Sequence, residues 1–146
     1  MLVVRDREIL LTFRVKICSM SVNAVVIDDD QDDLDLLKRV FQKHFPDIHT
    51  IYFTDPVEAL HAITQELFLV PDYIITDINM PKLTGDALIA ELRQRPELDQ
   101  TIICVLSTHM PEDKATSVKR AGAHHAFQKP AQYQHYQDIL KELFGR

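Results

Sequence analysis

Short apolar runs alternate with longer amphipathic stretches from residue 22 to the end of the chain. Three runs, Val22–Ile27, Tyr73–Thr76 and Thr101–Leu106, are rich in Val, Ile and Leu without strict alternation. Such runs are typical of strands that are buried on both faces of a parallel sheet. Two further runs, His49–Phe53 and Ala126–Gln128, complete a set of five predicted strands.

The stretches between these runs predict helices. Leu34, Leu37 and Phe41 recur at steps of three and four behind Asp30, which can cap the helix that they define. The segment 55–58 reads Asp-Pro-Val-Glu, a capping residue followed by proline at the first helical position. The remaining predicted helices are Ala87–Arg95, Pro111–Ala121 with Gly122 after its end, and Gln132–Phe144.

Five strand–helix units predict an α/β fold with a five-stranded parallel, doubly wound sheet. Right-handed crossovers place helices on both faces of such a sheet, which gives a three-layer sandwich. The length of 146 residues fits one compact domain. We assign residues 21–146 to this domain.

Residues 1–20 are expected to be an extension that is disordered or that precedes a native start at Met20. They carry four basic side chains against two acidic ones. The longest apolar stretch here, Ile9–Leu11, is too short for a signal-peptide core or a membrane span. The alternation of Phe13, Val15 and Ile17 with polar residues leaves an edge strand as the alternative.

The net charge of −6 argues against a nucleic-acid surface, because phosphate binding needs a basic face. Cys18 and Cys104 lie far apart without metal-ligand spacing, which favours a reducing compartment and predicts a cytoplasmic location. We therefore expect neither a nucleic-acid partner nor a membrane.

Polar side chains follow the predicted strands where each strand ends. Ligands of open α/β sheets bind at this edge, beyond the carboxyl ends of the strands. The side chains there are Asp28, Asp29 and Asp30 after the first strand, Asp77 after the third, Ser107 after the fourth and Lys129 after the fifth. Several carboxylates in one cleft raise each other's pKa, and a divalent cation such as Mg²⁺ relieves their repulsion. An Asp can also act as a nucleophile toward phosphorus, with Lys129 and Ser107 placed for phosphoryl oxygens.

Four segments together resemble the receiver domain of two-component response regulators. They are Val25–Asp30, Tyr73–Pro81 with Gly85, Leu106–Thr108, and Lys129–Pro130. The resemblance covers residues 22 to 144 and implies a flavodoxin-like (βα)5 fold. The Leu-Ser-Thr run followed by Pro-Glu-Asp at 111–113 is similar to stand-alone, chemotaxis-type receivers without an output domain.

The resemblance implies a role for each matching residue. Asp77 would accept the phosphoryl group, and Asp29 and Asp77 would hold Mg²⁺ (or Mn²⁺) directly. The backbone carbonyl of Asn79 would be a third ligand, and Asp28 would act through water. Such a protein catalyses only its own phosphorylation and dephosphorylation, and is otherwise not an enzyme.

Other positions matching the family complete the site. Ser107 would be the hydroxyl that moves to the phosphoryl group, and Lys129 the family's lysine. Ile78 and Thr108 are the further cofactor-binding positions. The Lys129–Pro130 bond is commonly cis in the family. One departure concerns signalling: Ala126 stands where the family usually has Tyr or Phe, which leaves the readout of the switch open.

The implied partners are proteins. A sensor histidine kinase or a histidine phosphotransfer protein would supply the phosphoryl group. A downstream protein would bind the surface made by the helix at 111–121, the strand at 126–128 and the helix at 132–144. The resemblance also allows a homodimer.

Two other functions remain open on the sequence. Asp28 and Asp30 form the D-x-D of aspartate-nucleophile phosphatases, although Asp32 stands two residues on and no cap segment is evident. A pseudo-receiver scaffold would lack site residues, and none is missing. Asp32 and Asp33 are interpreted as an acidic helix start favoured by the helix dipole.

Overall fold

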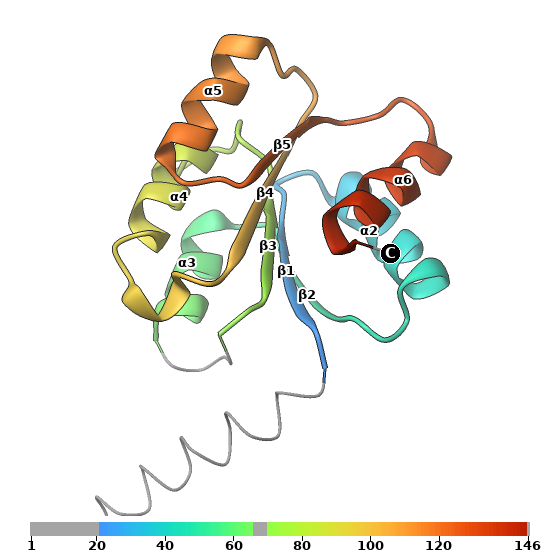
Figure 1. Ribbon diagram of the computed structural model, residues 1–146, viewed down its shortest axis with the longest axis horizontal. Helices are drawn as coiled ribbons and strands as arrows, with labels where there is room; N and C mark the ends of the chain where they lie inside the picture. The colour runs from blue at the N-terminus through green and yellow to red at the C-terminus, as the bar shows by residue number, and fades with distance from the viewer. Residues whose placement is uncertain (1–20, 66–69, 146) are drawn as a thin grey trace, which may run out of the picture.

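A five-stranded parallel sheet lies between two layers of helices in the computed structural model, which describes residues 21–65 and 70–145 (Figure 1). The strands are β1 (Asn23–Ile27), β2 (His49–Phe53), β3 (Tyr73–Thr76), β4 (Ile102–Ser107) and β5 (His125–Gln128). Their order in the sheet is β2-β1-β3-β4-β5, with every pair parallel. The predicted doubly wound α/β sandwich is confirmed. The expectations for residues 1–20, Cys18 among them, lie outside the described residues.

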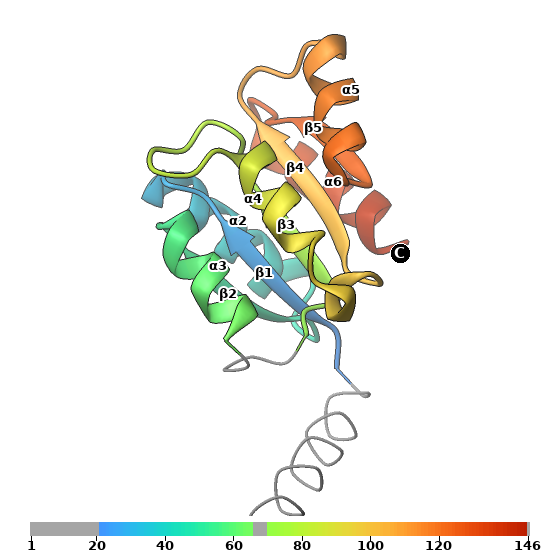
Figure 2. The same cartoon turned by 90° about the vertical axis from the view of Figure 1, so that its left-hand side faces the viewer.

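The helices divide between the two faces of the sheet (Figures 1 and 2). Helices α2 and α6 cover one face, and α3, α4 and α5 cover the other. The bounds are α2 (Gln31–His44), α3 (Pro56–Thr64), α4 (Gly85–Leu92), α5 (Glu112–Ala121) and α6 (Tyr133–Phe144), with a short 3₁₀ helix η2 (Pro96–Leu98). None of the helices in the described part of the chain is long and apolar enough to span a membrane.

Local sequence explains where α2 and α3 begin. The Asp30 side chain accepts a hydrogen bond from the backbone N–H of Asp32, and Asp55 caps α3 in the same way. The third predicted helix, Ala87–Arg95, was placed too late: α4 begins at Gly85 and ends at Leu92. It stops early because Pro96 disfavours the helical conformation of the residue before it and opens η2 instead.

The core consists of two clusters of side chains, one on each face of the sheet. Ala24 and Val26 of β1 pack toward α2 and α6, whereas Val25 and Ile27 pack toward α3, α4 and α5. Alternate residues of a strand point to opposite faces, so a strand buried on both sides must be apolar throughout. This burial fixes the strands in register, and the register decides which polar residues meet at the carboxyl edge.

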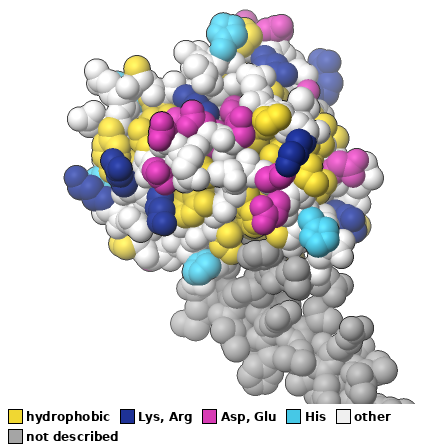
Figure 3. All heavy atoms as spheres, turned by 180° about the vertical axis from the view of Figure 1, so that it is seen from behind, with side chains coloured by type: hydrophobic (Ala, Val, Ile, Leu, Met, Phe, Trp, Pro, Cys, Tyr) yellow, Lys and Arg dark blue, Asp and Glu magenta, His cyan; other side chains and the backbone are white. Residues whose placement is uncertain are grey.

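Charged groups of both signs lie among apolar side chains on the face seen in Figure 3. That face of the described part therefore presents no continuous basic stripe of the kind that a nucleic-acid backbone binds.

Candidate functional site

Backbone hydrogen bonds bring the ends of the strands together at one edge of the sheet. The N–H of Asp77 donates to the carbonyl of Ile27 at 3.0 Å, so the residue after β3 sits beside the end of β1. The N–H of Lys129 donates to the carbonyl of Ser107 at 2.8 Å, which sets Lys129 beside the end of β4. These pairings place the polar residues that follow the strands around one centre.

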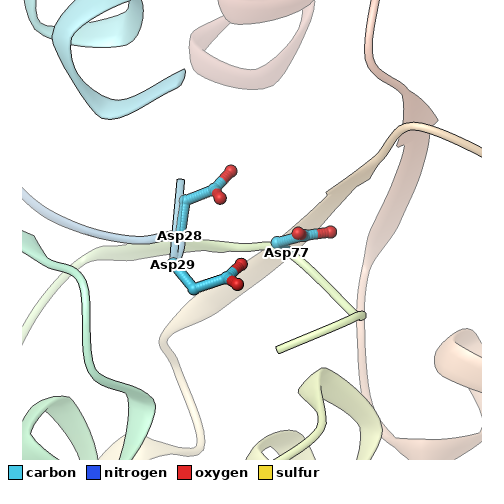
Figure 4. Close-up of side chains that lie close together, drawn as sticks. All are labelled: Asp28, Asp29 and Asp77. Carbon is cyan, nitrogen blue, oxygen red and sulfur yellow. The ribbon is translucent and has the colours of Figure 1, made fainter. Parts of the chain in front are cut away.

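Three aspartates form an acidic cluster at this edge (Figure 4). Asp28, Asp29 and Asp77 each offer a carboxylate oxygen, and the three oxygens lie within 4.8 Å of one another. Asp28 and Asp77 are buried, whereas Asp29 is exposed. Hard oxygen ligands at this spacing suit a divalent cation such as Mg²⁺, so the residues present fit the ion that the sequence predicts. Asp30 does not join them, because its carboxylate caps α2.

Lys129 contributes a positive charge within the cluster. Its Nζ donates to Oδ2 of Asp28 at 2.7 Å and lies 3.5 Å from Oδ2 of Asp77. Only 8% of the Lys129 side chain is exposed. An ammonium group this well enclosed by carboxylates partly neutralises them, and it stands within reach of any group bound to Asp77.

Burial and charge both shift the pKa values of this pair. Burial raises the pKa of Asp28 to about 6, although the hydrogen bonds from Lys129 and from the N–H of Asp30 oppose the rise. Burial alone would lower the pKa of Lys129, but its hydrogen bonds to carboxylates raise that pKa above its ordinary value. Lys129 is therefore a permanent cation at neutral pH.

The carboxylate of Asp77 is oriented by its own loop. Oδ1 accepts a hydrogen bond from the N–H of Ile78 at 2.7 Å, which leaves Oδ2 facing Lys129. The N–H of Gly85 donates to the carbonyl of Ile78 at 2.8 Å. A Cβ at Gly85 would lie 2.4 Å from the carbonyl oxygen of Asp77, so only glycine allows α4 to start this close to the loop. Asn79 is exposed two residues beyond Asp77.

Ser107 is fully buried, and its Oγ has no hydrogen-bond partner among the described residues. A buried hydroxyl without a partner is costly, and the large majority of buried side-chain polar atoms in native proteins have a partner. An oxygen-rich group at this edge would supply the missing acceptor. Thr108 follows on the exposed loop.

The sequence profile of the response regulator receiver domain matches residues 24–141. The chain belongs to this family. Receiver domains are the phosphoacceptor modules of two-component signalling, and they interact in general with histidine kinases or phosphotransfer proteins. The transcriptional regulatory protein PrrA of Mycobacterium tuberculosis is 34% identical over 127 residues, which cover 86% of this chain and 48% of PrrA. The chain thus spans about half the length of this curated relative.

Solved structures share the receiver fold. The Mn²⁺-bound form of response regulator Rcp1 has a TM-score of 0.75 at 23% identity, over 82% of this chain and 92% of Rcp1. The phosphorylated cyanobacterial phytochrome response regulator RcpA has a TM-score of 0.76 at 24% identity, over 84% of this chain and 91% of RcpA. The flavodoxin-like receiver fold implied by the sequence is confirmed.

One residue of this receiver site was missed by the sequence reasoning. Asp33, interpreted as part of an acidic helix start, accepts a hydrogen bond from Nζ of Lys129 at 2.7 Å. The signal was its position one helical turn before Leu37, on the face of α2 that turns toward the sheet. Asp32, next to it, is exposed and fits the interpretation as a helix start.

Two further expectations concern the Lys129–Pro130 bond and Ala126. The described residues contain no cis peptide bond, so Lys129–Pro130 is trans and the expected cis form is wrong for this structure. The trans form is intrinsically favoured for X–Pro bonds, although by little. Ala126, at the position of the usual aromatic, is partly buried against the same core cluster as Met110. Phe127 packs toward the opposite face.

Proposed function

We propose that this receiver domain accepts a phosphoryl group on Asp77, with one Mg²⁺ (or Mn²⁺) held directly by Asp29, Asp77 and the backbone carbonyl of Asn79, and through water by Asp28. The observation that carries the proposal is the Lys129 ammonium, which stands 3.5 Å from Asp77 Oδ2 within a cluster of three aspartates. The Mn²⁺-bound form of Rcp1, a protein of the same fold, supports the choice of ion.

The chemistry asks little of the protein beyond position and charge. An oxygen of Asp77 attacks phosphorus, the P–N bond of a donor phosphohistidine breaks, and the imidazole leaves with the electron pair and takes up a proton. The cation, when bound, neutralises charge on the phosphoryl oxygens. Lys129 neutralises a further oxygen, and Ser107 donates its unpaired hydroxyl to another. Thr108 and Ile78 flank the group. Attack by water later releases phosphate and regenerates the Asp77 carboxylate.

The proposed donor is a sensor histidine kinase or a histidine phosphotransfer protein, as is general for receiver domains. Signalling would occur by contact with a downstream protein through the surface made by α5, β5 and α6, or through a homodimer. A cytoplasmic location and the absence of nucleic-acid and membrane partners are part of the same proposal. Its only catalysis would be its own phosphorylation and dephosphorylation.

The phosphatase alternative is disfavoured by the second residue of the D-x-D pair. A general acid must be free to reach the substrate, but Asp30 Oδ1 accepts from the N–H of Asp32 at 2.9 Å as the cap of α2. The scaffold alternative is disfavoured because the acidic cluster is complete and Lys129 stands beside Asp77, an arrangement that a scaffold does not need.

The test is incorporation of label from [³²P]acetyl phosphate with Mg²⁺. Up to one phosphoryl group per chain is expected, sensitive to hydroxylamine as an acyl phosphate must be, and no label is expected when EDTA is present from the start of the reaction. Asp77→Asn should abolish the label. Asp32→Asn is the matched control, since Asp32 is exposed beside the site, and it should be labelled like the wild type.

Two results would overturn the proposal. Label that persists in Asp77→Asn would place the phosphoryl group elsewhere. Repeated turnover of an organic phosphate that is lost in Asp28→Asn would assign the chain to the phosphatases instead.

A further inference from the structure

The ammonium group of Lys129 has a second close carboxylate partner, and that partner lies outside the acidic cluster. Lys129 Nζ donates to Asp28 Oδ2 and to Asp33 Oδ2, each at 2.7 Å. Asp28 belongs to the set of oxygens that can hold a cation, whereas Asp33 does not. We propose that Asp33 is a positioning residue that keeps the Lys129 ammonium beside Asp77 while a cation and a phosphoryl group occupy the site.

The inference rests on the proposed function and follows from competition for Asp28. An ammonium group has three protons to donate, and two of them are engaged by Asp28 and Asp33. A divalent cation at the cluster draws the negative charge of Asp28 and Asp77 toward itself. Both then hold Lys129 less strongly. Asp33 lies outside the cluster, so a cation bound there would leave the hydrogen bond between Lys129 and Asp33 intact.

Asp33 is well anchored for this task. It lies in the first turn of α2, whose start is fixed by the Asp30 cap and whose inner face is fixed by the buried side chains of Leu34 and Leu37. The helix dipole favours a carboxylate at this position. Its side chain is 29% exposed, so it borders the site and is not enclosed within it. A functional group held by a rigid element is placed more accurately than one held by a loop.

Lys129 needs such an anchor because its own chain is flexible. Four rotatable bonds separate its amine from the backbone, and an unanchored lysine samples many rotamers. A phosphoryl group would then have to restrict Lys129 when it arrives, which weakens binding. With Asp33 in place, the amine is already restricted and needs only to turn its remaining proton toward the phosphoryl oxygen.

The experiment compares Asp33→Ala and Asp33→Asn with Asp32→Ala. Asp32 is the matched control, because it is an exposed acid in the same helical turn and its loss changes the charge by the same amount. Affinity for beryllofluoride in Mg²⁺ is followed by ¹⁹F NMR. The Lys129 side chain is followed by NMR of ¹³C-lysine-labelled protein, with its signal assigned by Lys129→Arg.

We expect Asp33→Ala to weaken beryllofluoride binding by about 10- to 100-fold, the usual loss when a supporting partner is removed. On addition of Mg²⁺, the chemical shift of the Lys129 side chain should move toward that of a free lysine in this variant alone. Asp33→Asn should recover most of the affinity, since the amide oxygen still accepts a hydrogen bond. Asp32→Ala should match the wild type in both measurements.

Three outcomes would overturn the role of Asp33. One is wild-type affinity together with an unchanged Lys129 signal in Asp33→Ala. Another is an equal loss of beryllofluoride affinity in Asp32→Ala, which would mean that the effect comes from removing a negative charge from the start of α2. The third is no recovery in a folded Asp33→Asn. If Asp33→Ala does not fold, Asp33→Leu takes its place with Asp32→Leu as its control, because leucine also removes the acceptor and is a good helix former. A wild-type Lys129 signal and wild-type affinity in Asp33→Leu would then overturn the role.

Failure of the proposed function would look different. A wild-type protein that takes no label on Asp77 would overturn phosphorylation. The Lys129 signal in Mg²⁺ alone would still report whether Asp33 holds the amine.

Discussion

The substitution Gly85→Ala sets two physical effects against each other, and the structure decides between them. Gly85 is the first residue of α4, and by helix propensity alone alanine would stabilise that helix by up to about 1 kcal/mol. The added Cβ, however, would lie 2.4 Å from the carbonyl oxygen of Asp77 and 2.7 Å from Cα of Ile78. Both contacts are with backbone, which cannot turn aside as a side chain can.

The size of the displacement follows from these distances. Ordinary contact begins at 3.4 Å, so the Asp77 carbonyl and α4 must separate by about 1 Å. Overpacking of this kind costs about 1–3 kcal/mol, and the hydrogen bond from Gly85 N–H to Ile78 adds about 1 kcal/mol if it breaks. After subtracting the gain in propensity, we expect a net loss of about 1–3 kcal/mol. A shift of about 1 Å at Asp77 should also slow phosphorylation by about 100-fold.

The assay combines urea unfolding, followed by circular dichroism, with the rate of labelling from acetyl phosphate. Gly145→Ala is the control: Gly145 has a positive φ of 69°, but a Cβ added there would meet no atom within 4 Å. It should lose about 1 kcal/mol through backbone strain and keep the wild-type rate of labelling. A Gly85→Ala protein with wild-type stability and wild-type labelling would refute the steric argument.

Three further predictions concern single side chains. Ser107→Ala should leave the free energy of unfolding in urea unchanged or raise it by about 1 kcal/mol, because the lost hydroxyl is buried without a partner. The same variant should change how beryllofluoride alters amide exchange in the loop after Ser107. Arg93→Ala should lose about 2 kcal/mol in the same assay, since its guanidinium donates to the carbonyls of Leu98, Thr101 and Gly122, and Arg93→Lys should restore only part. Burial and the nearby Arg93 lower the pKa of His124 below 6.5 in the folded protein. As the pH drops through 6.5, the imidazole is therefore protonated more readily in the unfolded chain than in the folded one, and the free energy of unfolding should fall. The exposed His124 keeps that effect below about 1 kcal/mol, and a His124→Gln variant whose stability has the same pH slope would contradict it.

Much of the fold could be predicted because the relevant information is local. Strands β2 and β3 were predicted with the bounds that the structure has, and β1, β4 and β5 differ by one residue at their ends. The caps of α2 and α3 could be predicted from the sequence, because a capping residue acts within one helical turn. The same pattern predicted that the carboxyl ends of the strands converge. Parallel strands share one edge, so the meeting of Asp28, Asp77 and Lys129 required only the order of the elements.

The contacts that give the site its detail were beyond the sequence. The pairing of Asp33 with Lys129 joins side chains 96 positions apart, and that of Arg93 with Gly122 joins residues 29 apart. Each depends on how a helix is rotated and how far it is shifted against the sheet. The helical period can place Asp33 on the inner face of α2, but neighbouring side chains decide collectively which distant group it meets. The unpaired hydroxyl of Ser107 likewise emerges only when all its surroundings are in place.

The sequence by itself thus determined the elements, their parallel order and the set of polar residues at the carboxyl edge, because hydrophobic period and capping act over a few residues. The tertiary structure alone decided which carboxylates hold Lys129 and which buried hydroxyls lack a partner. Hydrogen bonds are sensitive to displacements of a fraction of an ångström, and only the packed core sets positions that closely.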